Sequence, residues 1–257
     1  MVSTATDVTV EHRDRIAVVT IHRPPANFFD FTLISDLADA LHGLGDGGCR
    51  AAVLAAEGRH FCAGADFGSG GAPTDRVDSS RRLYREAVRL FRVPIPVVAA
   101  VQGAAVGGGL GLACSADFRV AVATARFHAN FAALGFHQGF GLSTTLPRLV
   151  GAQRAAELLY TARKVDGRQA VEIGLADRLA EGDDPLPAAV AMANEIAASA
   201  PLAVRSMKQT LRAGLAEEVA AATERELAEQ TRLWATEDCA IGIAANLARE
   251  VPDFVGR

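Results

Sequence analysis

The sequence is short of several features that mark particular classes of protein. Its four cysteines are scattered without CxxC spacing, which argues against a structural zinc site and against a disulfide framework in a chain of 257 residues. We therefore expect a reducing, cytoplasmic setting. The formal net charge is -4 with acids and bases interspersed, so the chain offers no basic face of the kind that binds phosphate backbones. We expect no nucleic-acid partner.

The chain also lacks a recognisable leader and a convincing membrane segment. Residues 1–7 contain no basic stretch followed by an apolar run, so we expect neither a secretory nor a transit peptide. Residues 93–116 carry no charge and are long enough to cross a membrane. They include Pro94, Pro96, Gln102 and five glycines, a composition typical of a buried strand, a tight turn and a buried helix. We expect no membrane association.

Apolar residues are plentiful. They make up 50% of the chain against 22% charged residues, which indicates a globular protein with a sizeable core.

His60, Cys62 and Cys114 are the side chains from which a metal site could be drawn. Small buried thiols are common core residues and explain the cysteines without a metal. We therefore expect no metal.

The order of apolar runs predicts an α/β fold in which strands and helices alternate as in βαβ units. Strands are expected at residues 16–21, 51–55 and 96–101, and helices at residues 31–42 and 80–91. Glycines punctuate residues 43–48. Residues 68–73 read Gly-Ser-Gly-Gly-Ala-Pro, a flexible connection that is a candidate for mobility near a substrate.

The pattern changes at about Leu186 to alanine-rich helices that break at Pro201 and Gly214. A helix that is apolar around much of its circumference must bury more than one face, and packing on neighbouring subunits would do this. We therefore divide the chain into an α/β core, residues 1–185, and a helical region, residues 186–257.

Several motifs follow one another along the chain. They are Arg-Pro-Pro-Ala-Asn-Phe at 23–28, Gly-Arg-His-Phe-Cys-Ala-Gly-Ala-Asp at 58–66, the glycine-rich block at 103–117, Leu134-Gly135, and Leu-Pro-Arg-Leu-Val-Gly at 146–151. In this order they resemble the enoyl-CoA hydratase/isomerase (crotonase) superfamily over nearly the whole chain. The resemblance implies a crotonase-like spiral ββα core that binds acyl-CoA, and a helical C-terminal region for trimerisation and site closure. It also implies a homotrimer or a dimer of trimers.

The resemblance implies an oxyanion hole formed by the backbone amides of Ala65 and Gly108. A CoA thioester that reacts at its α or β carbon passes through an enolate, whose negative oxygen needs donors placed in advance. Small residues at a tight turn and at a helix N-terminus supply such donors and let the thioester come close. The other substrate-binding residues implied by the motifs are Pro25, Ala26, Phe28, Ala63, Asp66, Phe67, Gly107, Gly111, Phe131 and Gly135.

Carboxylates are missing where the chemistry of the family needs them. A hydratase of this family uses two glutamates as general base and general acid, and their positions are Gly111 and Phe131 here. Residues 136–141, where some isomerases and dehalogenases carry an aspartate, hold no carboxylate either. His137 precedes a helix expected to start near Gly141, and it is our candidate catalytic substitute because histidine can act as acid or base near neutral pH.

We therefore expect an enzyme of hydratase or isomerase type that acts on a fatty acyl-CoA thioester with non-standard acid/base residues. Coenzyme A would be part of the substrate, so no separate cofactor is expected. Decarboxylation and thioester hydrolysis stay open. So does an inactive acyl-CoA-binding protein in which Phe131, Phe136 and Phe140 line an acyl tunnel. Lys208 and Arg249 match places where family members present cations toward CoA.

Overall fold

The computed structural model describes residues 7–65 and 73–257. Its centre is a six-stranded sheet in the order β1-β2-β3-β4-β6-β9, beside a three-stranded sheet in the order β5-β7-β8. The strands are β1 Val8–Arg13, β2 Ile16–Ile21, β3 Ala51–Ala56, β4 Val97–Val101, β5 Ala104–Val106, β6 Phe118–Val122, β7 Arg126–His128, β8 Lys164–Asp166 and β9 Arg178–Ala180. Only the β1–β2 pair of the larger sheet is antiparallel, so the sheet is mixed.

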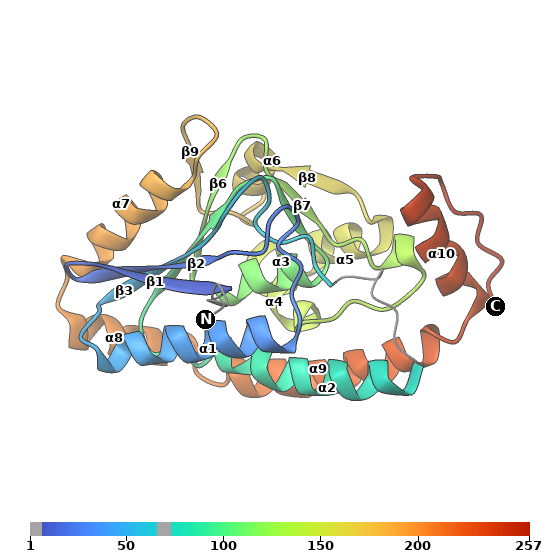
Figure 1. The fold of residues 1–257 in the computed structure, drawn as a ribbon, viewed down its shortest axis with the longest axis horizontal. Coiled ribbons are helices and arrows are strands. Elements are labelled where there is room, and N and C mark those ends of the chain that lie inside the picture. The colour runs from blue at the N-terminus through green and yellow to red at the C-terminus, as the bar shows by residue number, and fades with distance from the viewer. Residues whose placement is uncertain (1–6, 66–72) are drawn as a thin grey trace, which may run out of the picture.

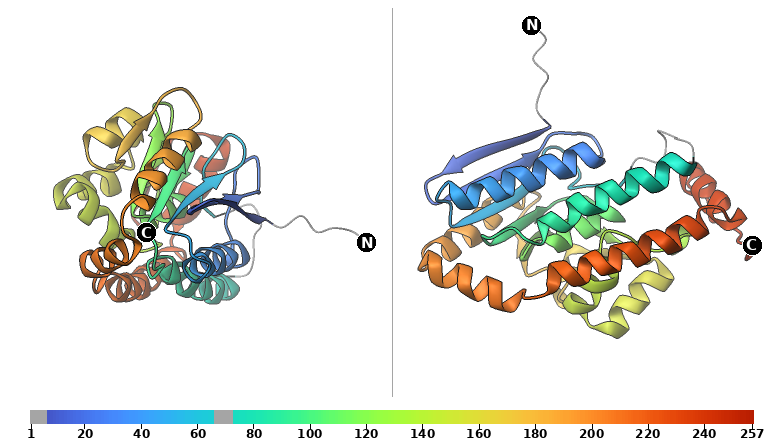
Figure 2. Two further views of the ribbon diagram at one scale, coloured as in Figure 1. Left: turned by 90° about the vertical axis from the view of Figure 1, so that its left-hand side faces the viewer. Right: turned by 90° about the horizontal axis from the view of Figure 1, so that it is seen from below.

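Helices cover both faces of the larger sheet (Figure 1). They are α1 Phe31–Asp46, α2 Pro73–Leu90, α3 Gly108–Ser115, the 3-10 turn η1 Ala132–Leu134, α4 Leu142–Val150, α5 Ala152–Thr161, α6 Gly167–Glu172, α7 Leu186–Ala197, α8 Pro201–Leu211, α9 Leu215–Leu233 and α10 Glu237–Ala248. Helix α7 packs against β2, β3 and β4, while α1, α2 and α9 lie side by side as a layer (Figure 2, right). This α/β architecture confirms the predicted fold class.

The predicted order of elements is confirmed for the strands at 16–21, 51–55 and 96–101, and for the helix breaks at Pro201 and Gly214. Helix α1, however, runs through the glycines that were expected to end it at residue 42. Leu44 is buried and a Cβ on Gly45 would lie 2.7 Å from Pro94 Cγ, so packing overrides the low helix propensity of glycine. Helix α2 begins at Pro73 rather than at residue 80.

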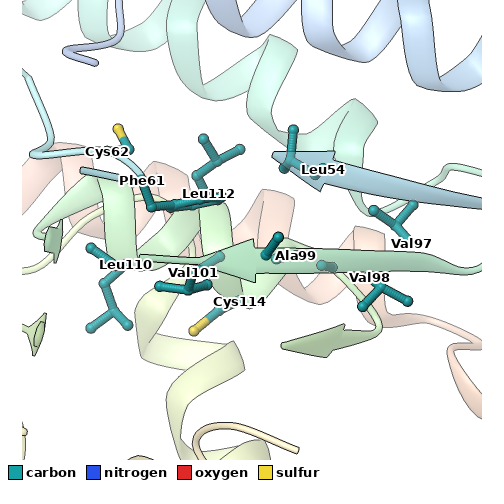
Figure 3. Close-up of a cluster of buried hydrophobic side chains, with 14 of the residues drawn as sticks. Leu54, Phe61, Cys62, Val97, Val98, Ala99, Val101, Leu110, Leu112 and Cys114 are labelled. Atoms are coloured by element: carbon teal, nitrogen blue, oxygen red, sulfur yellow. The ribbon is translucent and has the colours of Figure 1, made fainter. Parts of the chain in front are cut away.

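The uncharged segment at 93–116 forms β4, β5 and α3, as predicted. Figure 3 shows how side chains from β3, β4 and α3 gather there, among them Leu54, Val101 and Leu112, all at most 1% exposed. Among the described residues, no single helix is long and apolar enough to cross a membrane, and one bent pair, Leu186–Ala197 with Pro201–Leu211 at 105°, meets the criteria of length and composition together.

The helical C-terminal region shares its core with the rest of the chain. Ala189, Met192 and Ala193 of α7 are buried in the main hydrophobic cluster, so this chain's own sheet covers an apolar face that could have contacted a neighbouring subunit. The division at residue 185 and the role of residues 186–257 in trimerisation remain predictions.

Helix α8 is tied to the sheet by a charge cluster. The carboxylate of Asp117 accepts hydrogen bonds from the Val97 backbone amide, from Lys208 Nζ at 2.7 Å and from the Arg212 guanidinium at 2.8 Å. Lys208 Nζ also donates to the carbonyl of Ile95 at 2.7 Å. The amine predicted to face CoA is therefore committed to an internal contact, and its role here is to hold α8 in place.

Candidate active site

A cavity with a volume of about 890 Å³ lies among the described residues. Its lining comes from residues between Arg23 and Phe31, from the turn at 63–65, from Gly108 at the start of α3, from α2, from residues between Asn130 and Phe140, and from α9 and α10. Segments far apart in the sequence thus enclose one space. Such a concave, mostly apolar cavity is where small-molecule ligands usually bind.

Two backbone amides, those of Ala65 and Gly108, lie on the wall of this cavity. Their segments are joined because the Val106 amide donates to the Cys62 carbonyl at 3.0 Å, and a Cβ on Gly64 would lie 3.8 Å from the Gly108 nitrogen. Neither amide donates a hydrogen bond to any other residue within the described ranges. Gly108 is the first residue of α3, where amides have no partner inside the helix and the helix dipole favours negative charge.

Close contacts explain why glycines surround these amides. A Cβ on Gly109 would lie 2.1 Å from the Cys62 carbonyl oxygen, and a Cβ on Gly108 would lie 2.3 Å from Phe29 Cζ. Neither contact can exist without displacing the backbone or the ring. The glycines therefore let α3 press against the turn at 62–65, and this contact sets the spacing of the two free amides.

Hydrocarbon occupies both positions at which the resemblance places glutamates in a hydratase. A Cβ on Gly111 would lie 2.6 Å from Cβ and 2.8 Å from Cδ1 of Phe140, so the phenylalanine fills the volume that a side chain at 111 would need. Phe131 lines the cavity, and its ring packs edge-on against Phe136 with centroids 5.9 Å apart. Neither position can transfer a proton.

Several of the residues that line the cavity are aromatic. Phe140 is 1% exposed and packs edge-on against Phe29 with ring centroids 5.5 Å apart. Phe136 packs in the same way against Trp234 at 6.3 Å, and the Arg76 guanidinium lies over the Trp234 ring at 4.2 Å. Burial lowers the pKa of Arg76. The wall is suited to an apolar ligand.

Two polar side chains face the cavity from helices that the sequence analysis did not connect. The Tyr84 hydroxyl of α2 donates to Gln230 Oε1 of α9 at 2.8 Å, and Gln230 Nε2 donates to the His137 carbonyl at 3.0 Å. Burial, with the nearby Glu226 carboxylate, raises the pKa of Tyr84, so its hydroxyl is neutral. These two residues are 146 positions apart, and no local pattern signals their contact.

Glu226 is a fully buried carboxylate behind the cavity wall. It accepts hydrogen bonds from the Gly141 amide at 2.8 Å and the Ser143 amide at 2.9 Å, where α4 begins. Burial raises the pKa of Glu226, although both amides favour its charged form. This residue holds the segment 137–143 and is not among the described residues that line the cavity.

A carboxylate does line the cavity at its Arg23 end, but it is already engaged. Asp30 caps α1 by accepting from the Leu33 amide at 2.9 Å, and it pairs with the Arg23 guanidinium at 2.9 Å. Arg23 also pairs with Asp7 at 2.7 Å. These contacts make a helix cap and an ion-pair network at this end of the cavity.

The structure brings many of the predicted site residues together. Pro25, Ala26, Phe28, Ala63 and Phe131 line the cavity with Ala65 and Gly108. Asp66 and Phe67 lie outside the described residues, as do residues 68–72 of the predicted flexible connection.

Four predicted residues are not part of the described cavity lining. Gly107 and Gly111 support it from behind, Gly107 as the cap of α3 and Gly111 against Phe140. Gly135 has a left-handed backbone and packs on α10, where a Cβ would lie 2.6 Å from the Asp238 carbonyl. His137 Nδ1 lies 2.9 Å from the Gln138 carbonyl oxygen. His137 is thus not among the described residues that line the cavity, and its catalytic role remains a prediction.

The four cysteines are free and buried. Burial raises the pKa of the Cys62 thiol to about 12 and that of the Cys114 thiol to about 11. A raised thiol pKa keeps these side chains protonated at neutral pH and unreactive. They act as small apolar core residues, as expected from the sequence.

Comparisons with known proteins agree with this geometry. Residues 11–257 match the model of the family described as enoyl-CoA hydratase/isomerase. The chain is 31% identical to a probable enoyl-CoA hydratase of Bacillus subtilis, over 94% of this chain and 95% of the relative. It is 30% identical to crotonyl-CoA hydratase of Syntrophomonas wolfei, over 98% of each. The crystal structure of an enoyl-CoA hydratase/isomerase from Pseudoalteromonas atlantica superposes with a TM-score of 0.84 at 30% identity, over 97% of this chain and 100% of that one. The chain belongs to the enoyl-CoA hydratase/isomerase family.

Proposed function

We propose that this protein binds a fatty acyl-CoA thioester in the cavity and stabilises negative charge on the thioester oxygen with the amides of Ala65 and Gly108. The observation that carries the proposal is that Ala65 and Gly108 both line an apolar cavity and that neither amide has an acceptor among the described residues. Amides fixed in this way act before the charge develops, so they need no reorganisation during the reaction. Hydratases and isomerases of the family provide the precedent for acyl-CoA as the ligand.

The cavity suggests how the two parts of the thioester lie. The CoA portion would run along Pro25, Ala26 and Phe28, and the acyl chain would enter the aromatic chamber beside Phe131 and Trp234. Apolar side chains at that end favour a hydrocarbon chain because its burial releases it from water. Coenzyme A is part of the substrate in this proposal, and the proposed chemistry requires no further cofactor.

The chemistry that follows must work without the two glutamates. Gly111 and Phe131 supply no proton acceptor, so standard hydration loses its general acid and base. Decarboxylation is favoured as a second candidate by the same observation. Cleavage of the bond between the α carbon and a carboxylate releases CO2 and leaves the electron pair in the enolate, so no base is needed, and the enolate then takes a proton from water. Thioester hydrolysis and binding without turnover are the remaining alternatives.

We propose that the protein assembles through its helical region as a homotrimer or a dimer of trimers. Leu202, Met207 and Leu211 of α8 are exposed in the single chain and offer apolar surface for such contacts. We further propose a reducing, cytoplasmic location, in keeping with the four free cysteines.

Binding of butanoyl-CoA and of free CoA tests the proposal by calorimetry. The wild type should bind butanoyl-CoA more tightly than CoA. Gly108→Val should remove this preference, because its side chain would displace Phe29 and crowd the carbonyl site. Gly43→Val is the matched control, since Gly43 lies on exposed helix surface with nothing within 4 Å of a Cβ. Equal affinity for both ligands in the wild type would contradict the proposal.

Product analysis then separates the chemical alternatives. Mass spectrometry after incubation with enoyl-CoA, 2-carboxyacyl-CoA and acyl-CoA thioesters detects gain of water, loss of CO2 or release of free CoA respectively. Tight acyl-CoA binding with none of these products would support the binding protein. Gly108→Val should suppress whichever product forms.

A further inference from the structure

We propose that Phe140 is the specificity-determining residue of this site, and that it restricts the acyl group to chains without a branch at the α carbon. Glu226 and Gln230 are the positioning residues that hold Phe140 in place. This inference rests on the proposed function, because it takes the Gly108 amide as a donor to the thioester oxygen.

The ring of Phe140 lies beside the carbonyl site. A Cβ on Gly108 would be 3.5 Å from Phe140 Cδ2, which is ordinary van der Waals contact. In this proposal, a thioester whose oxygen meets the Gly108 amide places its α carbon, one bond from the carbonyl carbon, next to this ring. A methyl group on the α carbon competes with the ring for the same space.

Packing on two sides prevents the ring from swinging away. Gly111 lies against one side, with its Cβ position only 2.6 to 2.9 Å from Phe140 side-chain atoms, and Phe29 packs edge-on against another. The side chain is 1% exposed, so neighbouring atoms cover nearly all of it. Close-packed interiors resist such displacement.

The backbone at Phe140 is also held against its own preference. Its φ is 61°, a left-handed conformation that is uncommon for a bulky residue and must be maintained by the surroundings. Gln230 holds the segment on one side by donating to the His137 carbonyl at 3.0 Å. Glu226 holds it on the other side by accepting from the Gly141 and Ser143 amides.

Both holding residues belong to α9, and Tyr84 of α2 orients one of them through Gln230 Oε1. Tyr84, Glu226 and Gln230 therefore share one effect, which is to fix the position of an apolar ring. The same ring takes the volume of a side chain at 111, so the selection of acyl shape and the loss of the first glutamate have one physical cause.

Affinities for butanoyl-CoA and 2-methylbutanoyl-CoA, measured by calorimetry, test the inference without requiring turnover. The wild type should prefer the straight chain by about tenfold or more, the range that one methyl group commonly produces in a tight pocket. Phe140→Ala should abolish the preference, and Phe140→Leu, which keeps more of the packing, should reduce it. Phe136→Ala is the matched control, because it removes an aromatic ring from the same cavity near Trp234 and should keep the preference.

The positioning role has its own readout in the ratio of the two affinities. Glu226→Gln retains one acceptor oxygen and should lower the straight-chain preference in the wild-type background. It should produce no further change in the Phe140→Ala background, since the ring it positions is absent. If Glu226 had only a structural role, Glu226→Gln would lower the affinity for both thioesters alike and leave the ratio of the two affinities unchanged. That result would overturn the assignment of Glu226.

Two results overturn the role of Phe140. One is equal affinity of the wild type for both thioesters. The other is an undiminished preference in both Phe140→Ala and Phe140→Leu. A wild type that binds neither thioester more tightly than free CoA contradicts the proposed function instead, so the two failures can be told apart.

Discussion

Two glycine-containing turns on the cavity wall differ in what they present. The turn at 64–65, against Gly107 to Gly109, presents backbone amides, and close contacts leave no room for side chains at Gly108 and Gly109. The turn at 139–141 presents an aromatic ring between two glycines. The first matches the motifs of the family, whereas the second stands where carboxylates would be expected to act.

The difference separates what the scaffold supplies from what side chains supply. Every residue except proline carries an amide N–H, so a helix N-terminus pressed against a tight turn provides donors without a particular side chain, as long as small residues allow the close contact. A general acid or base depends on one side chain at one position. This chain carries Gly111 and Phe131 at the two positions where the resemblance places the glutamates, and we propose that it keeps the amide pair.

Hydration of crotonyl-CoA should show the largest effect of this difference. Loss of general acid/base groups typically costs about 10²–10⁴ in rate, so we expect turnover slower by that factor than in a hydratase that carries both glutamates. Loss of the enoyl-thioester absorbance measures the rate. A rate equal to that of the glutamate-containing enzyme would show that another group has replaced the glutamates.

Gly109→Ala should disrupt the contact between α3 and the turn that carries the Ala65 amide. Its Cβ would lie 2.1 Å from the Cys62 carbonyl oxygen, so the backbone must shift, at a cost of about 3 kcal/mol or more in the free energy of unfolding. Urea-induced unfolding measures the loss, with Gly43→Ala as the control on open helix surface. A loss no larger than that in Gly43→Ala would mean that α3 does not press on this turn.

Glu226→Gln tests the aromatic turn at 139–141 through the pH dependence of the free energy of unfolding. Burial raises the pKa of Glu226, so the folded protein binds this proton more tightly than the unfolded chain. The contribution of this bound proton to the free energy of unfolding is therefore complete below the ordinary glutamate pKa of 4.5. It is lost as the pH rises toward the pKa of Glu226 in the folded protein. Each unit of pKa difference corresponds to about 1.4 kcal/mol.

We therefore expect the stability of the wild type, relative to Glu226→Gln, to fall as the pH rises above 4.5 and then to level off. Unfolding in urea at a series of pH values measures this difference. A difference that stays constant with pH, or one that grows as the pH rises, would contradict the assigned direction of the pKa.

His137→Ala should have the smallest effect. The imidazole does not line the described cavity, so we expect the affinity for butanoyl-CoA and any turnover to change by less than about threefold. The affinity for butanoyl-CoA and the turnover rate are measured for the wild type and the variant at several pH values. A large fall in turnover with unchanged affinity would restore the sequence-based prediction that His137 is the catalytic group.

The sequence allowed the scaffold to be predicted because the relevant signals are local. Apolar runs predict β2, β3 and β4, and the motifs around Ala65 and Gly108 imply the amide pair. Helix α1 shows the limit of this approach, since its end depends on how Leu44 and Gly45 pack against distant residues.

The wall of the cavity could not be predicted in the same way. Tyr84, Glu226 and Gln230 look like ordinary helix residues, and only the packing of α2 and α9 brings them to the segment 137–143. Gly111 could be recognised as a missing glutamate, but that Phe140 fills its place depends on contacts that no spacing encodes. The prediction for His137 rests on the chemistry of histidine and on its position just before α4, and neither indicates whether its side chain faces the cavity.

The infrared spectrum of butanoyl-CoA labelled with carbon-13 at the thioester carbonyl tests the amide pair most directly. Donors at Ala65 and Gly108 would polarise the bound carbonyl, so we predict a stretching band at lower frequency in the complex than in water, and loss of that shift in Gly108→Val. A bound thioester whose carbonyl band stays at its frequency in water would contradict the role of the two amides.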